Sequence, residues 1–194
     1  MSRKLIGIFV CMLLIANIIP VMVMAGDEEN PEIIDELSDT GLYTLDINSV
    51  WFYEKLNDPE YLFISMKIEN LNEKISAVFS VTWFYNNIKY VSGLDISFYR
   101  EKVFRSGLYQ RATHRQWLSM PECEGTYDVD SNIITWKILK ENIGNPQKDS
   151  VLTKTRASAV LGFPLNLLLF LFVDYRDFAP SVVTEYGKDY IINY

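Results

Sequence analysis

The stretch YLFISMKIE, residues 61–69, decides the fold, because apolar side chains recur in it at every second position. The first set of alternate positions is entirely apolar and consists of Leu62, Ile64, Met66 and Ile68. The second set is mostly polar and consists of Phe63, Ser65, Lys67 and Glu69. Successive side chains of a β-strand point to opposite faces, whereas those of a helix repeat every 3.6 residues. The stretch therefore predicts a strand with one buried and one solvated face.

The same period of two recurs along the chain, separated by turn residues. We expect further strands at 50–53, 78–85, 88–94, 125–129 and 133–139. Between them stand Asn57-Asp58-Pro59, Asn86-Asn87 and Asp130-Ser131-Asn132, residue types that favour tight hairpin turns. No amphipathic helix of three or more turns is predicted, and residues 140–143 have room for one helical turn. The pattern predicts an all-β, antiparallel, jelly-roll-like β-sandwich over residues 42–194.

The composition supplies a core large enough to need no disulfide. The chain is 49% hydrophobic and 14% aromatic. Of its two cysteines, Cys11 lies in the N-terminal apolar segment, which leaves Cys123 without an intrachain partner.

A second apolar stretch, residues 161–173, is interrupted by Pro164 and Asn166. We expect it to be a buried strand or loop; an exposed contact surface for a partner is the alternative.

The first 25 residues are typical of an export signal. Arg3 and Lys4 precede an almost unbroken apolar run over 5–23, and Val23-Met24-Ala25 fits the cleavage motif. We expect cleavage there, and a secreted or cell-surface protein. The alternative is an uncleaved membrane anchor, since 20 residues from Leu5 to Met24 are enough to span a bilayer.

Residues 26–41 are acidic and predict a solvated linker, with at most one helical turn at 33–37. The whole chain has a net charge of −7, and removal of Arg3 and Lys4 would change it to −9. This charge disfavours nucleic acid as a partner. We expect contact with a membrane only if the N-terminal segment is retained.

The residues that hydrolases use are scarce. His114 is the only histidine, and no Gly-x-Ser-x-Gly elbow or phosphate-binding loop occurs. A catalytic triad needs a histidine beside its nucleophile, and zinc sites need several His or Cys ligands. We therefore predict no catalytic residues and no enzyme activity, with a hydrolase based on a carboxylate pair as the remaining alternative.

Several segments together resemble the secreted β-sandwich modules of the DOMON and family-9 carbohydrate-binding type, as found in archaeal exported proteins and appended to subtilisin-like proteases. The matching segments are Asp46–Phe52, Tyr61–Leu71, Gly125–Asp128, Ile133–Ile138, Ile143–Pro146, Val151–Thr153 and Asp177–Pro180. The resemblance implies a sandwich that binds or docks and does not catalyse. Such modules often hold a structural calcium between loops, and for this chain that implies Asp174 and Asp177 as ligands, with no other cofactor.

A second acidic motif, Asp128-x-Asp130-x-Asn132, imitates the start of a calcium loop. It lacks the later glycine and the bidentate glutamate that such loops carry. We therefore expect these residues to form a hairpin turn.

Candidate ligand contacts come from aromatic and basic residues outside the core pattern. Phe84 faces away from Trp83 and Tyr85 by strand parity, so it should point outward. Sugars stack on such exposed aromatic planes. The segment 100–117 breaks the alternation and holds a surplus of basic residues. We predict a ligand-binding surface made of Phe84, Tyr99, Arg105, Tyr109, Arg111 and Trp117.

These observations predict a non-catalytic, exported binding module that recognises carbohydrate or a cell-surface glycan. The alternative is a protein-interaction domain that associates with a secreted protease or a surface layer. The basic segment favours an acidic partner: an acidic cell-surface glycan or the chain's own residues 27–39.

Overall fold

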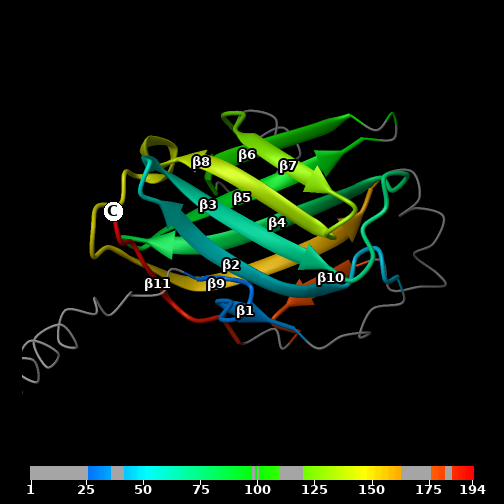
Figure 1. Ribbon diagram of the computed structural model, residues 1–194, viewed down its shortest axis with the longest axis horizontal. Helices are drawn as coiled ribbons and strands as arrows, with labels where there is room; N and C mark the ends of the chain where they lie inside the picture. Colours follow the sequence, from blue (N-terminus) through cyan, green and yellow to red (C-terminus); the bar gives the residue numbers. More distant parts are fainter. Residues whose placement is uncertain are drawn as a thin grey trace, which may run out of the picture.

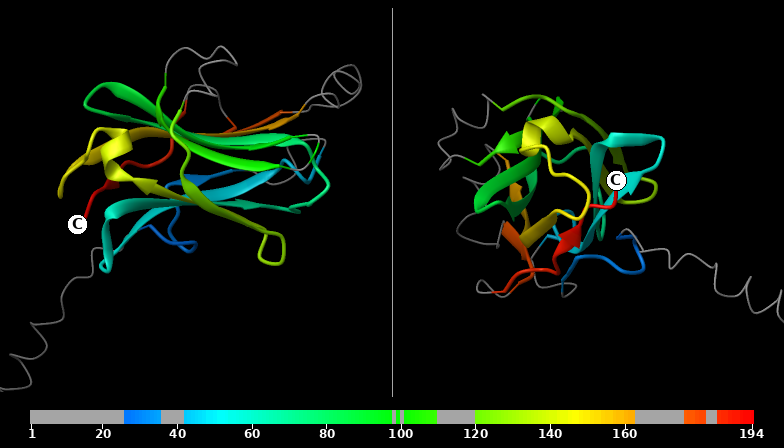
Figure 2. Two further views of the ribbon diagram at one scale, coloured as in Figure 1. Left: turned by 90° about the horizontal axis from the view of Figure 1, so that it is seen from above. Right: turned by 90° about the vertical axis from the view of Figure 1, so that its left-hand side faces the viewer.

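The protein is an antiparallel β-sandwich of two sheets (Figure 1). The computed structural model describes residues 26–35, 42–97, 99, 101–109, 120–162, 176–181 and 185–194. Seen from above, the two sheets form separate layers (Figure 2). The predicted fold class, an all-β antiparallel sandwich, is confirmed.

The first sheet has five strands and the second has six. The first runs in the order β1 (Ile33–Ile34), β2 (Ile47–Lys55), β3 (Asp58–Ile68), β8 (Ile133–Leu139) and β7 (Glu124–Asp128). The second runs in the order β10 (Arg176–Ala179), β9 (Val151–Leu161), β4 (Ala77–Tyr85), β5 (Ile88–Ile96) and β6 (Lys102–Leu108), with β11 (Tyr190–Ile191) paired to β9. A 3₁₀ turn, η1 (Lys140–Ile143), is the only helical element among the described residues.

The predicted turns join the strands that the alternation indicated. Asn86 and Asn87 have φ values of 50° and 62°, the left-handed region that a tight hairpin requires and asparagine tolerates. At the Asp130–Asn132 turn, the Asp128 carboxylate accepts hydrogen bonds from the N–H of Asp130 (3.0 Å) and the hydroxyl of Ser131 (2.7 Å). The motif therefore closes a hairpin, as expected. The β2–β3 turn begins one residue early, at Leu56-Asn57, and β3 starts at Asp58.

The core lies between the sheets and consists of the aliphatic and aromatic residues of alternate positions. Phe52 of the first sheet meets Trp83 of the second edge to face, with ring centroids 5.9 Å apart. Phe52 also stacks on Tyr190 at 5.6 Å, so the C-terminal segment contributes to the core. All three side chains are buried, and their burial supplies a large share of the hydrophobic stabilisation.

The prediction of a solvated linker is wrong for residues 31–33, which are buried. Ile33 and Ile34 form strand β1 against β2 instead of a helical turn. Next to them, the Glu32 carboxylate accepts a hydrogen bond of 2.8 Å from the Phe52 N–H. The edge of β2 offers an N–H group that needs an acceptor, and this need outweighs the acidic composition of the segment. Residues 36–41 lie outside the described part of the chain.

Burial raises the pKa of Glu32 to about 7, against the opposing effect of the hydrogen bond from Phe52. The carboxylate packs so tightly against Gly26 that a Cβ at that position would lie 2.4 Å from its oxygens. The backbone oxygen of Glu32 also accepts a hydrogen bond of 2.7 Å from the Lys188 N–H. The N-terminal and C-terminal segments are thus joined at one site.

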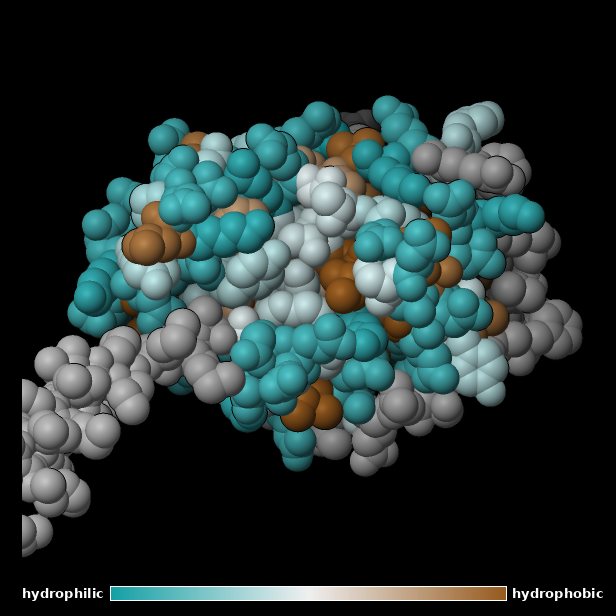
Figure 3. Space-filling model, in the orientation of Figure 1, coloured by the Kyte–Doolittle hydropathy of each residue, from teal (hydrophilic) through white to brown (hydrophobic). Residues whose placement is uncertain are grey.

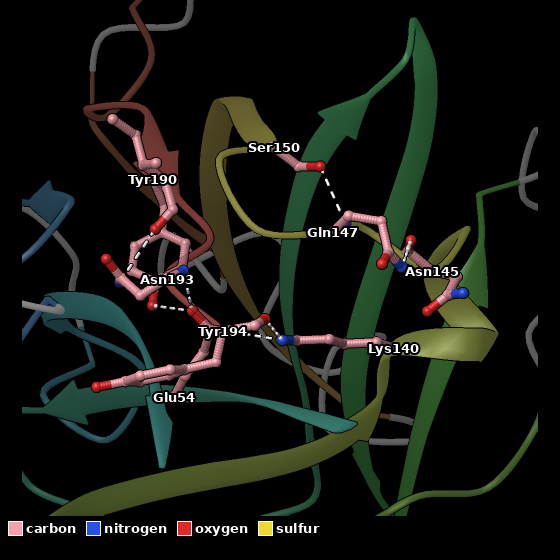
Figure 4. Close-up of polar contacts among 9 residues, drawn as sticks. Glu54, Lys140, Asn145, Gln147, Ser150, Tyr190, Asn193 and Tyr194 are labelled. Atoms are coloured by element: carbon pink, nitrogen blue, oxygen red, sulfur yellow. Dashed lines mark hydrogen bonds and ion pairs between the residues drawn. The ribbon is translucent and has the colours of Figure 1, made fainter. Parts of the chain in front are cut away.

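A buried ion pair holds the C-terminal segment at the end of the sandwich (Figure 4). The Lys140 ammonium contacts the Glu54 carboxylate, and the two side chains are 5% and 0% exposed. Glu54 also accepts hydrogen bonds from the Asn193 N–H (2.6 Å) and the Tyr190 hydroxyl (3.3 Å). Lys140 donates a further one to the main chain of Tyr194 (2.5 Å). These bonds satisfy both buried charges.

The export-signal segment, residues 1–25, lies outside the described residues, as do residues 163–175 of the second apolar stretch. Leu161, where that stretch begins, is buried at the end of β9. Among the described residues, no helix is long and apolar enough to cross a membrane.

Candidate functional site

The outer face of the second sheet carries the candidate site. Phe79, Val81 and Trp83 of β4 are buried in the core, so the residues between them face outward. Phe84 belongs to this outward set, and its predicted orientation is confirmed. The face is therefore formed by the alternate residues of five neighbouring strands.

The register of these strands places small residues in the middle of the face. Ser80 of β4 lies opposite Ser158 on one side and Gly93 on the other. The hydroxyls of Ser80 and Ser158 hydrogen-bond to each other at 2.8 Å. Larger residues flank this row, so the centre of the face forms a hollow.

The hollow is a groove with a volume of about 430 Å³, within the range of small-molecule sites. Strands β4, β5, β9 and β10 and the residue after β6 contribute to it. Its lining residues are Val78, Ser80, Thr82, Lys89, Val91, Tyr109, Arg156, Ala157, Ser158 and Phe178. This mixture of apolar walls and a few polar groups is typical of ligand sites.

Two aromatic side chains border the groove, and a different cation lies beside each ring. The Lys89 ammonium lies 4.3 Å from the ring centroid of Tyr109. The Arg156 guanidinium carbon lies 5.9 Å from the ring centroid of Phe178, which is 40% exposed on the edge strand β10. Cation–π contacts of this kind hold each cation beside a ring.

The two cations lie close enough to affect each other. Burial lowers the pKa of Lys89, and the positive charge of Arg156 lowers it further. Among the described residues, no carboxylate lies within ion-pair distance of the Lys89 ammonium. Of the described residues that line the groove, two are basic and none is acidic.

The structure brings together only part of the predicted ligand surface. Tyr109 lines the groove, and Phe84 lies on the same face with the Lys154 ammonium 5.3 Å from its ring. Tyr99 is 90% exposed at the opposite end of the β5–β6 hairpin, more than about 20 Å from Tyr109 at 3.3 Å per strand residue. Tyr99 therefore does not share a site with the other two.

The two basic residues of segment 100–117 that the structure describes, Lys102 and Arg105, face opposite sides of β6. Arg105 faces the same side as Ser80, but its guanidinium pairs with Glu122 at 2.9 Å. Lys102 instead lies over the ring of Tyr127, at 4.5 Å. Arg111 and Trp117 lie outside the described residues. Strand geometry explains the division, because neighbouring positions of β6 face opposite sides.

Asp177, predicted as a calcium ligand, is buried and accepts a hydrogen bond of 2.6 Å from the Ile47 N–H. Its carboxylate thereby joins the edge of β10 to the start of β2. Asp174 lies outside the described residues. In the part of the chain that the structure describes, no three His, Cys, Asp or Glu side chains gather in a way that could hold a metal ion.

Cys123 has the wrong environment for a nucleophile. Burial, together with the charges of Glu122 and Glu124, raises the pKa of its thiol to about 12. A thiol attacks as the thiolate, which is scarce at neutral pH under these conditions. His114 lies outside the described residues.

Several groove residues were missed by the sequence analysis: Ser80, Lys89, Arg156, Ser158 and Phe178. Strand parity indicates that Ser80 and Lys89 face outward together with Phe84. The contribution of β9 and β10 depends on the β4–β9 pairing, which joins positions 78 residues apart. No local pattern encodes that pairing.

The outer face of the first sheet also carries aromatic residues, but these cover one another. Tyr53 stacks on Phe63 with ring centroids 5.1 Å apart, and the Lys55 ammonium lies 4.4 Å from the Phe63 ring. Figure 3 views this face and shows pale and brown residues in its centre between hydrophilic ones. Phe63 is only 4% exposed and has no open ring face for a ligand.

Comparison with known proteins adds no family to this description. The chain matches no family model, no curated protein and no solved structure. The resemblance to DOMON and family-9 carbohydrate-binding modules therefore stays a prediction from sequence.

Proposed function

We propose that this protein is an exported, non-catalytic binding module, secreted or held at the cell surface, that recognises carbohydrate or a cell-surface glycan. The ligand would occupy the groove on the outer face of the second sheet. The observation that carries the proposal is the combination of aromatic borders with a hydroxyl-bearing floor in one hollow of about 430 Å³.

The chemistry of the groove suits a sugar. The apolar face of a pyranose ring stacks on aromatic side chains, and Tyr109 and Phe178 supply rings on two sides of the hollow. The sugar hydroxyls need hydrogen-bonding partners, which Ser80, Ser158 and Thr82 supply from the floor. Whichever of the two paired serines donates to the other, one O–H remains to donate to a ligand.

Strands position all of these groups except Tyr109, which follows β6 directly. Ser80 and Thr82 lie on the central strand β4, which is hydrogen-bonded on both sides. Binding to a pre-formed site of this kind costs little conformational entropy. The export signal predicted for residues 1–25 supports an extracellular ligand.

The purified protein should be screened on a glycan array, with and without calcium. Positive glycans should then be titrated by calorimetry against Tyr109→Ala and Phe178→Ala. Each variant removes one ring, and we expect each to weaken binding by about tenfold or more. Tyr61→Ala is the matched control, because Tyr61 lies on the outer face of the first sheet beside Lys137.

Loss of binding in the groove variants alone would support the proposal. Equal loss in Tyr61→Ala, or binding unaffected by either groove variant, would place the ligand elsewhere. A chain that binds no glycan but co-purifies with an extracellular protein would favour the alternative function, an accessory domain for a secreted protease or surface layer.

A further inference from the structure

We infer that cleavage of the export signal after Ala25 stabilises the fold, because the α-ammonium group that it creates on Gly26 forms a buried ion pair with the Glu32 carboxylate. This inference rests on the export proposed above and is independent of the carbohydrate ligand. Three features support it: the contact between Gly26 and Glu32, the turn that holds the two residues together, and the position of the cleavage motif directly before Gly26.

Gly26 lies directly against the Glu32 carboxylate. A Cβ on Gly26 would lie 2.4 Å from each of the two carboxylate oxygens. The nitrogen and the Cβ position of one residue are about 2.5 Å apart, so the Gly26 nitrogen lies within about 5 Å of both oxygens. Both residues are buried, and Glu32 is 9% exposed. A charge on this nitrogen would therefore act on the carboxylate with little screening by water.

A tight turn brings Gly26 back to Glu32. The Asp27 carboxylate accepts a hydrogen bond of 2.8 Å from the Asn30 N–H, which reverses the chain between the two residues. Glu32 is fixed in turn by the hydrogen bond of 2.8 Å that it accepts from the Phe52 N–H of β2. Release from the preceding peptide leaves Gly26 free to rotate about its Cα–C bond, which can bring the nitrogen to hydrogen-bond distance.

The Glu32 carboxylate has no close cation while Gly26 is part of a peptide bond. Among the described side chains, no Lys or Arg nitrogen lies within ion-pair distance of it. Burial raises its pKa to about 7; the more distant charge of Lys188 lowers this pKa and that of Asp27 raises it. Tyr190 also faces the carboxylate, which raises the pKa of the phenol. An adjacent ammonium group would favour the charged carboxylate and offset the cost of its burial.

Cleavage supplies a cation at this position. Hydrolysis by the export peptidase adds one water molecule to the Ala25–Gly26 amide, which leaves a carboxylate on Ala25 and an α-amine on Gly26. The amine takes up a proton at neutral pH, because its ordinary pKa is about 8. The motif Val23-Met24-Ala25 predicts cleavage at this bond, and the residue that follows it is the one that contacts Glu32.

Glycine is required at this position for the contact to form. Besides the two carboxylate oxygens, a Cβ on Gly26 would lie 2.6 Å from the Phe52 carbonyl oxygen, a backbone atom that cannot move aside. The Glu32 carbonyl oxygen also accepts the Lys188 N–H, so an ion pair at Glu32 would strengthen the junction of the N-terminal and C-terminal segments. The fold would reach its full stability only after the signal has been removed.

Two exported chains that differ by one residue test this inference. The first has the natural sequence, and the second has one additional Val between Ala25 and Gly26, which moves the ammonium group one residue away from Glu32. N-terminal sequencing of each secreted product gives the cleavage site. We expect the natural product to begin at Gly26 and to unfold about 5 °C or more above the extended product at pH 7.

Matched variants locate the ion pair. Glu32→Gln should bring the melting temperatures of the natural and extended products to within about 1 °C of each other, because the carboxylate is gone from both. Glu28→Gln is the control for loss of one acidic charge, since Glu28 pairs with Lys67 on the surface and its side chain is 48% exposed. This control should leave the difference between the two products unchanged.

The pH dependence of stability gives a second measurement that needs no variant at Glu32. In the extended product the Gly26 nitrogen is a neutral amide, as in the uncleaved chain, so stability should be lost as pH rises from about 4.5 to 7. In the natural product the ammonium group lowers the pKa of Glu32, and the carboxylate raises that of the ammonium. Its stability should therefore hold from about pH 5 to 8 and fall only as the ammonium loses its proton above pH 8.

The outcomes separate this inference from the carbohydrate function. Equal melting temperatures of the two products, or a difference that persists in Glu32→Gln, would overturn the ion pair. A secreted chain that begins elsewhere than Gly26, or that keeps residues 1–25, would also overturn it. None of these measurements involves a sugar, so the ion pair can fail while glycan binding stands, and the reverse.

Discussion

Replacing Lys140 with Met should destabilise the fold by about 3–5 kcal/mol, because it leaves the Glu54 carboxylate buried without its cation. Glu54 is 0% exposed and would keep only the Asn193 N–H and the Tyr190 hydroxyl as donors. For a chain of this size, each kcal/mol lowers the melting temperature by about 2–4 °C, so we expect a decrease of about 10 °C.

A double variant separates charge burial from loss of packing. In Lys140→Met/Glu54→Gln the amide oxygen still accepts the Asn193 N–H, but no charge is buried. We expect the double variant to recover at least half of the lost stability; the single variant Glu54→Gln completes the double-mutant cycle and gives the coupling energy. Urea unfolding followed by tryptophan fluorescence measures the free energy of unfolding of all four proteins.

Lys137→Met is the matched control, three residues earlier in the chain. Lys137 pairs with Glu124 at 3.3 Å on the surface, where the Glu124 side chain is 74% exposed. Exposed pairs contribute about 0–1 kcal/mol, so this variant should be nearly neutral. Equal effects of the Lys137 and Lys140 substitutions, or a double variant no more stable than Lys140→Met alone, would refute the reasoning.

Three further predictions concern single positions. The pKa of Glu32 is raised from 4.5 to about 7, so the folded state holds the proton more tightly; stability is retained at low pH and lost as pH rises from about 4.5 to 7. Glu32→Gln should remove this loss and be the more stable protein at pH 8 in urea titrations across pH. Gly125→Ala should cost about 1–3 kcal/mol, because its Cβ would lie 2.2 Å from the Phe104 ring, whereas Gly107→Ala, with its nearest atom at 3.4 Å, should be tolerated in the same thermal assay. Asn87→Val should cost about 1 kcal/mol by calorimetry, since a β-branched residue is strained at φ 62°, and Asn87→Gly should not.

Local pattern was sufficient to predict β2, β3, β4, β5, β7 and β8 and the hairpins between them, but not β1, β6, β9, β10 or β11. The alternation around Ile64 and Trp136 identified β3 and β8, because burial of one strand face dictates the residue at every second position. Asn86-Asn87 identified its hairpin because few residue types tolerate positive φ. Fold class follows from these two signals together.

Features that depend on distant pairing could not be predicted in this way. Acidic neighbours suggested that Glu32 is solvated, but its carboxylate is buried because it accepts a hydrogen bond from the Phe52 N–H on the open edge of β2. Tyr99 and Tyr109 were grouped because they are close in sequence, but a strand of seven residues separates them. Arg156 joined the site only through the β4–β9 pairing, which no nearby residue signals.

The order of strands has a consequence for how the chain is made. Ser65 meets Thr135 across β3 and β8, 70 residues apart, and Ser80 meets Ser158 across β4 and β9, 78 residues apart. During synthesis, β3 and β4 emerge long before these partners exist, so one edge of each stays open and aggregation-prone until the ribosome has passed residue 161. Loops this long also close slowly. The nascent chain therefore exposes one unpaired edge of β3 and one of β4 until β8 and β9, their partners, have been made.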